Sequence, residues 1–212
     1  MARLLSLGIA LALGATVAFA ADEAGKTAQA VELVAAIHGG MLRAEGTSLG
    51  FTSGDNVVLT LTNASAQPLA VRVTPGMILA PDDPEASPVA VRRVSGKTLA
   101  DDKIEAVAGI VLAPRQTERY ALQAFSIDCR RRDPAARARL TPTALDPVLG
   151  ALFRHANEED CSLATIQAAV WLHAGGLTDE RLTRRLKIDK LGILDARDLL
   201  RQAEEEAGRV KP

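Results

Sequence analysis

The sequence predicts an α+β protein dominated by β-structure, in which an antiparallel β-sandwich is followed by a small C-terminal helical subdomain. Two observations predict this order. Between residues 50 and 127, short runs of alternating apolar and polar residues are separated by turn-forming residues, which is the period of half-buried strands. After Pro142, the apolar residues adopt helical spacing and follow capping residues, which is typical of short packed helices.

An export signal is predicted at the N-terminus. Arg3 precedes an apolar and small-residue run over residues 4–17, and residues 18–20 (Ala-Phe-Ala) fit a small-x-small cleavage site. Residues 1–20 are therefore expected to be a signal peptide, with a mature chain in the periplasm or outside the cell. An uncleaved anchor is the alternative, but the run barely reaches the roughly 20 residues that span a bilayer. No membrane insertion is expected after signal removal.

Composition limits the partners that this chain is expected to bind. Removal of the signal peptide takes one arginine from the 25 basic residues, so 24 basic residues face 26 acidic ones. This near-neutral balance gives no electrostatic reason to expect nucleic acid as a partner. Aromatic residues make up 3% of the chain, which argues against a stacking surface for carbohydrate or single-stranded nucleic acid.

Residues 21–49 form a lead-in segment before the predicted sandwich. Over residues 27–42, the apolar residues fit one face of a helix or one face of a strand, and the glycine pair at residues 39–40 ends either element. A short helix is the preferred prediction.

The sandwich is predicted over residues 50–134. Its clearest strands are residues 57–62 and 69–74, which alternate apolar and polar residues on either side of a turn at residues 63–68. Further strand candidates are residues 77–79, 89–94, 104–112 and 117–127. Five to seven short strands with turns at this spacing imply a sandwich of immunoglobulin-like kind.

The helical appendage is predicted over residues 143–207, and residues 208–212 form a polar tail. The expected helix starts are Asp146, Ser162, Thr178 and Asp195. Asp146 is followed by a proline at the first helical position, and apolar residues flank Thr178 and Asp195 at the spacing of a hydrophobic staple. Trp171 is expected to anchor the core of this appendage.

The two cysteines that remain after signal removal, Cys129 and Cys161, are predicted to form a disulfide. An isolated pair in an oxidising compartment is more often joined than free. Cys129 would leave the last strand and Cys161 would precede the second helix, so the bond would pin the appendage to the sandwich. Metal ligation by the pair, or a nucleophilic role for one cysteine, are the alternatives.

A metal site in the helical appendage is the main alternative to a protein without bound cofactors. His155, His173 and Cys161 could approach one another if the first two helices of the appendage pack side by side, with the acids at residues 158–160 nearby. The preferred interpretation is two helical histidines beside a disulfide, so no metal or other cofactor is predicted. A metal-dependent binder or enzyme using His155 and His173 is the alternative.

Motifs of common enzyme classes are missing from the sequence. It contains neither G-x-S-x-G nor a phosphate-binding glycine loop, and Ser53 falls in a loop before a strand. Acidic residues cluster at 82–85 and 101–102 in polar loops, where solvation is expected and calcium binding is an alternative. The chain is therefore predicted not to be an enzyme.

The densest basic cluster lies at the junction between the predicted sandwich and appendage. It comprises Arg130, Arg131 and Arg132, with Arg137 and Arg139 shortly after them. The first three arginines and the exposed face of the appendage are the predicted contacts with a protein partner. The alternatives are a solvated linker, or ion pairs with the acids at residues 158–160.

The strand–Asn–turn–Pro–strand pattern over residues 61–73, followed by a Pro-Gly pair at residues 75–76, resembles many exported bacterial sandwich domains of immunoglobulin-like type. Its distance from residues 108–114 and 120–122 suits that architecture as well. The resemblance covers residues 40–130. It implies a scaffold used for adhesion, envelope structure or assembly, and it carries over no catalytic residue.

Taken together, the sequence predicts an exported, non-enzymatic scaffold or protein-interaction module of the cell envelope. A purely structural envelope component is a further alternative.

Overall fold

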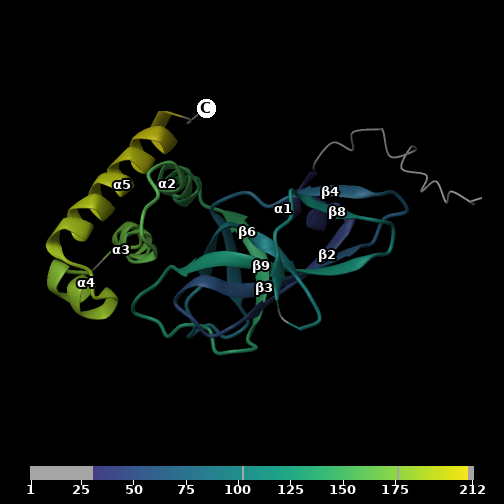
Figure 1. Cartoon of the computed structure of the whole chain (residues 1–212), viewed down its shortest axis with the longest axis horizontal. Helices are drawn as coiled ribbons and strands as arrows, with labels where there is room; N and C mark the ends of the chain where they lie inside the picture. The colour runs from purple at the N-terminus through teal and green to yellow at the C-terminus, as the bar shows by residue number, and fades with distance from the viewer. Residues whose placement is uncertain (1–30, 102, 176, 210–212) are drawn as a thin grey trace, which may run out of the picture.

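The computed structural model describes residues 31–101, 103–175 and 177–209 (Figure 1). The predicted signal peptide, the first ten residues of the lead-in segment and the last three residues of the tail lie outside this part of the chain.

Six strands form a closed antiparallel barrel, so the prediction of an immunoglobulin-like sandwich is wrong. The barrel strands are β2 (Leu42–Ser48), β3 (Ser53–Asn63), β5 (Met77–Pro81), β6 (Val89–Thr98), β9 (Thr117–Ser126) and β10 (Arg139–Leu145). They are hydrogen-bonded in the order β2-β3-β9-β6-β5-β10, and β10 pairs again with β2. Closure removes the free sheet edges that two stacked sheets would have.

The closure depends on strands from outside the predicted sandwich. β5 is paired on both sides, because Met77 faces Val91 on one neighbour and Leu145 on the other. β10 spans the boundary at which the helical appendage was predicted to begin, and β2 lies within the predicted lead-in segment. The extra pairings convert the expected open sheets into a ring.

The barrel interior is filled by side chains that alternate along the strands, as the pleat requires. In β3, for example, the interior residues are Val57, Leu59 and Leu61. The buried interior set on the barrel strands comprises Leu42, Val57, Leu59, Leu61, Met77, Leu79, Val89, Val91, Tyr120, Leu122, Ala124 and Leu140. Burial of each large aliphatic side chain there stabilises the folded state by about 1.5–3 kcal/mol relative to leaving that side chain exposed to water.

A small helix and a three-stranded sheet complete the same core. The helix is α1 (Leu33–His38), and the sheet contains β1 (Val31–Glu32), β4 (Leu69–Arg72) and β8 (Ile110–Leu112). Buried residues of α1, β4 and β8 pack into the core cluster of the barrel interior. The preferred short helix in the lead-in segment is therefore confirmed, with a two-residue strand before it.

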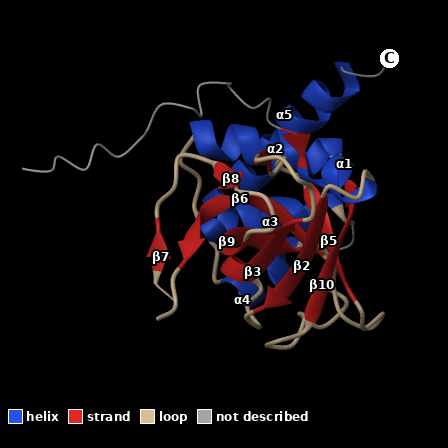
Figure 2. Cartoon of the chain, turned by 90° about the vertical axis from the view of Figure 1, so that its right-hand side faces the viewer, coloured by secondary structure: helices blue, strands red, loops and turns tan. Residues whose placement is uncertain are grey.

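Four helices form a layer on one side of the barrel (Figures 1 and 2). They are α2 (Pro147–Glu158), α3 (Leu163–His173), α4 (Asp179–Leu186) and α5 (Lys190–Arg209). Asp146, Ser162 and Thr178 cap the first three helices as predicted. The predicted cap at Asp195 is wrong, because the Asp189 carboxylate accepts from the Gly192 N–H at 2.8 Å and α5 begins before Asp195.

The barrel and the helical layer share a second core. Phe125 and Ala90 lie in this cluster with helical side chains, and the rings of Phe125 and Phe153 are 5.5 Å apart. Trp171 belongs to this core, which confirms its predicted anchoring role. The Gln167 amide also donates to the Ser126 carbonyl at 2.7 Å across the interface.

The predicted disulfide is absent, because both Cys129 and Cys161 are free. Cys161 precedes α3, whereas the Cys129 carbonyl accepts a hydrogen bond from Arg185, whose guanidinium lies 5.1 Å from the centre of the Trp171 ring near the other end of α3. Ten residues of helix separate Cys161 from Trp171, a rise of about 15 Å. A disulfide needs Cα atoms within about 7 Å, so α3 holds the two thiols apart.

Candidate functional site

The arginine-rich junction interacts with its own loop and with the loop between β5 and β6. Arg130 and Arg131 lie 3.5 and 3.4 Å from the Asp128 carboxylate, and Arg132 pairs with Asp83. Arg130 also donates to the Gly175 carbonyl at 3.2 Å, which ties this loop to the end of α3. The acidic partners of these arginines in the described chain are therefore not the acids at residues 158–160.

The two histidines of the alternative metal site interact with two different carboxylates. The His155 Nε2 atom lies 2.9 Å from a Glu206 oxygen, and the His173 Nε2 atom lies 3.1 Å from an Asp146 oxygen. The described residues contain no group of three or more His, Cys, Asp or Glu side chains arranged to hold a metal ion. The structure therefore does not bring the predicted ligand set together.

The His173–Asp146 pair has shifted protonation equilibria. The hydrogen bond with Asp146 raises the pKa of His173, against a smaller opposing effect of burial. Burial alone would raise the pKa of Asp146, but hydrogen bonds from His173 and from the Leu149 backbone N–H lower it. Because Asp146 also caps α2, this pair links the end of α3 to the beginning of α2.

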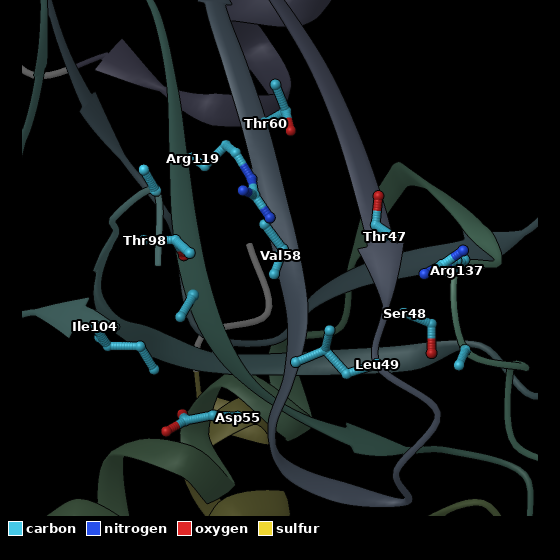
Figure 3. A pocket seen from close by; sticks show the side chains of 13 residues that line it. Thr47, Ser48, Leu49, Asp55, Val58, Thr60, Thr98, Ile104, Arg119 and Arg137 are labelled. Carbon is cyan, nitrogen blue, oxygen red and sulfur yellow. The ribbon is translucent and has the colours of Figure 1, made fainter. Parts of the chain in front are cut away.

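A groove of about 670 Å³ lies on the outer face of the barrel (Figure 3). Its floor is formed by outward-facing positions of two paired strands: Val58 faces Ala121, and Thr60 faces Arg119. The residues around it come from β2, β3, β6, β7 (Ile104–Glu105), β9 and three loops. The lining comprises Thr47, Ser48, Leu49, Asp55, Val58, Thr60, Thr98, Ala100, Ile104, Arg119, Ala121, Ala136 and Arg137.

Two large apolar side chains are exposed at this groove. Leu49, in the loop after β2, is 41% exposed, and Ile104, on β7, is 44% exposed. They come from different segments that border the same floor, which is made of small or branched side chains such as Val58 and Ala121. Exposed apolar side chains gathered at a concave surface are typical of a binding site.

A glycine sets the position of β7. A Cβ atom on Gly96 in β6 would lie 2.3 Å from the Glu105 carbonyl oxygen and 2.7 Å from the Ile104 Cγ2 atom. Only a residue without a side chain allows this approach, so Gly96 lets β7 pair with the end of β6. Ile104 is thereby held at the groove.

The loop between β9 and β10 supplies the other side of the groove. It is fastened to the β2–β3 region, since the Ser48 hydroxyl donates to the Pro134 carbonyl at 3.1 Å and the Arg137 N–H donates to the Ser48 carbonyl at 2.7 Å. The backbone of Arg137 is left-handed, with φ of 68°. Arg137 belongs to the basic stretch noted in the sequence, and the fold places it at the groove while Arg130–Arg132 pair elsewhere.

One hydroxyl group at the groove is left without a partner among the described residues. Asp55 accepts a hydrogen bond from the Ser95 hydroxyl, and the buried Thr98 hydroxyl has no hydrogen-bond partner in the part of the chain that the structure describes. A polar ligand group that reached Thr98 would satisfy it. The lining contains hydroxyls but neither histidine nor cysteine, so it lacks the nucleophile–base pairing of hydrolases.

Sequence reasoning missed the groove. Leu49 fell in the lead-in segment, and Ile104 was assigned to a strand without regard to its exposure. Their contributing segments are far apart along the chain and meet because β2, β3, β9, β6 and β7 are neighbours in the sheet. The nearest available signal was Arg137, which the sequence marked as part of a basic stretch.

Comparison with known proteins gives no relative for this chain: no family model, no curated protein and no solved structure matches it. Among the helices that the structure describes, none combines the length and apolarity required to cross a membrane.

Proposed function

We propose that this chain is an exported, non-enzymatic protein-interaction module that binds a segment of a partner protein in the barrel groove. The observation that carries the proposal is the pair of exposed apolar side chains, Leu49 and Ile104, on a concave floor of Val58 and Ala121. Export rests on the N-terminal sequence pattern.

The groove is favoured over the arginine-rich junction as the contact surface. Arg130, Arg131 and Arg132 already interact with Asp128 or Asp83, so a partner would have to compete with these contacts. The groove instead offers unfilled volume beside apolar side chains. Binding there removes apolar surface from water, which is the main source of affinity in most protein complexes.

The helical appendage carries other exposed apolar side chains. Leu191 and Leu194 lie one turn apart on α5, and both are exposed. The experiment below therefore observes both surfaces at once.

The test is methyl NMR on the mature protein with a pool of capped octapeptides that combine leucine, serine, glutamate and lysine. We expect concentration-dependent shifts of the Leu49, Val58 and Ile104 methyl signals, with the Leu191 and Leu194 signals unchanged. These methyl groups report directly on the two surfaces.

Shifts confined to Leu191 and Leu194 would move the contact to the appendage and overturn the groove assignment. No shift at either surface would favour a purely structural envelope component. A metal-dependent role would require zinc or copper to shift the imidazole signals of His155 and His173 together in a separate NMR spectrum, although these two residues interact with different carboxylates.

A further inference from the structure

We infer that the groove recognises a segment of a partner protein in which a large apolar side chain neighbours a carboxylate. This inference rests on the proposed function and adds the chemistry of the bound segment.

The charge of the barrel face is the first argument. A second hollow adjoins the groove and shares Thr60 with it. Among the residues that the structure describes, the two hollows are together lined by four arginines, Arg43, Arg119, Arg137 and Arg139, and by two carboxylates, Glu45 and Asp55. The complete chain has a formal net charge of −1, so this positive surface is a local feature.

The two carboxylates of this face already have partners. Asp55 accepts a hydrogen bond from the Ser95 hydroxyl, and Glu45 lies 3.8 Å from Arg139. Arg137, by contrast, is exposed, and its side chain makes no hydrogen bond or ion pair with another described residue. An arginine fork of this kind matches the two oxygen atoms of a carboxylate.

The arrangement of apolar and charged groups is the second argument. Figure 3 shows Arg119 and Arg137 above Leu49 and Ile104, with Asp55 below them. If a side chain of the bound segment lies between Leu49 and Ile104, the residue next to it in that segment would therefore face a guanidinium group. Charge complementarity at such a rim contributes specificity and association rate, whereas the apolar contact contributes most of the affinity.

The floor of the groove fits a branched or aromatic side chain of the bound segment. Ala100, Ala121 and Ala136 are the small residues of the lining, and they leave room beside Val58. An acidic segment without an apolar side chain would leave this space empty and would bind poorly.

The test is fluorescence anisotropy with three labelled, capped octapeptides: alternating Leu-Glu, alternating Leu-Lys and alternating Ser-Glu. We expect the Leu-Glu peptide to bind at least tenfold more tightly than either of the others. Its affinity should fall by about tenfold in R137E, a loss equivalent to about 1.4 kcal/mol.

The matched control is R181E. Arg181 is an exposed arginine on α4 that makes no side-chain ion pair within the described chain, and it lies in the helical layer. R181E should bind the Leu-Glu peptide as the wild type does, and circular dichroism should show that both variants are folded.

The outcomes separate this inference from the proposed function. Equal binding of the Leu-Glu and Leu-Lys peptides, with groove methyl shifts, would overturn the charge preference and leave the groove as the binding site. Unchanged Leu-Glu affinity in R137E would also overturn it. Loss of binding in R181E but not in R137E would overturn both the inference and the groove assignment.

Discussion

Arg92 joins the barrel to the helical layer. It lies on β6, is 6% exposed, and donates to the Ala156 carbonyl at 3.1 Å, the Asn157 side chain at 2.8 Å and the Gln123 side chain at 3.0 Å. All three acceptors are neutral oxygen atoms, and burial lowers the pKa of the guanidinium. Two of the acceptors lie at the end of α2, where the helix dipole favours a cation.

Replacement of Arg92 should therefore destabilise the whole protein. In R92M the three oxygen atoms would lose their donor while remaining at a buried interface, and we expect the free energy of unfolding to fall by about 2–4 kcal/mol. Urea denaturation measures this change. The neighbouring Arg93 is exposed, so R93M should change the value by no more than about 0.5 kcal/mol. Equal effects of the two substitutions would rule out the proposed role of Arg92.

The His173–Asp146 pair predicts a pH-dependent stability. The folded pKa of His173 is raised, so the stabilisation from its charged form is present below the unfolded pKa of about 6.5 and is lost as pH rises through the folded value. H173Q should therefore lose more unfolding free energy at pH 5.5 than at pH 8.5. D146N keeps a capping side chain and should remove the same pH-dependent difference. A difference that persists in D146N would point to another partner.

At the scale of elements, the position of β7 at the groove depends on Gly96. A Cβ atom at Gly96 would collide with the backbone of Glu105, so the G96A substitution should move Ile104 away from the groove. We expect the Leu-Glu peptide to bind several-fold more weakly to G96A, because the apolar contact at Ile104 is lost. Fluorescence anisotropy measures this affinity.

Gly109 provides the control for this prediction. It lies in the same connection between β6 and β8, and a Cβ atom there would meet no atom within 4 Å. G109A should bind the peptide as the wild type does. Wild-type affinity in G96A would show that Ile104 does not form part of the binding surface.

Most single elements could be predicted from the sequence, because their signals are local. The alternation of Val57, Leu59 and Leu61 marks β3, and the side chains of Asp146, Ser162 and Thr178 mark three helix starts. The prediction that a helix begins at Asp195 was wrong, because Asp189 lies earlier in the chain and its side chain accepts the capping hydrogen bond instead.

β10 and β2 could not be recognised because their patterns are weak. β10 contains only two buried residues, Leu140 and Pro142, and its register shifts after the proline. β2 contains Gly46, where a Cβ atom would lie 3.0 Å from Leu140 of β10. This glycine allows the two strands to approach each other closely. In the sequence, however, a glycine indicates the end of a strand rather than its interior.

At the scale of the whole molecule, a sandwich and a barrel differ in which strands are hydrogen-bonded to each other. They do not differ in how apolar and polar residues alternate along each strand. Both folds bury alternate residues, so the strand pattern alone does not distinguish them. The distinction comes from β5, which pairs with β6 and also with β10, about 60 residues further along the chain. No local pattern in the sequence indicates that long-range contact, so the closure of the barrel could not be predicted.

The free cysteines belong to the same scale. A covalent bridge between the two parts was expected, but buried contacts join them: Arg92 and Gln167 bond across the interface, and Phe125 packs on Phe153. The barrel and helices therefore need no cross-link to form one packed body.

Hydrogen exchange measured by mass spectrometry, with and without the Leu-Glu peptide, tests most directly whether the barrel groove is the binding surface. We expect slower exchange in the segments that carry Leu49, Ile104 and Arg137, with no change in the connection between α4 and α5 around Lys187. Slower exchange confined to α4 and α5, with these three groove segments unaffected, would contradict the assignment of binding to the barrel.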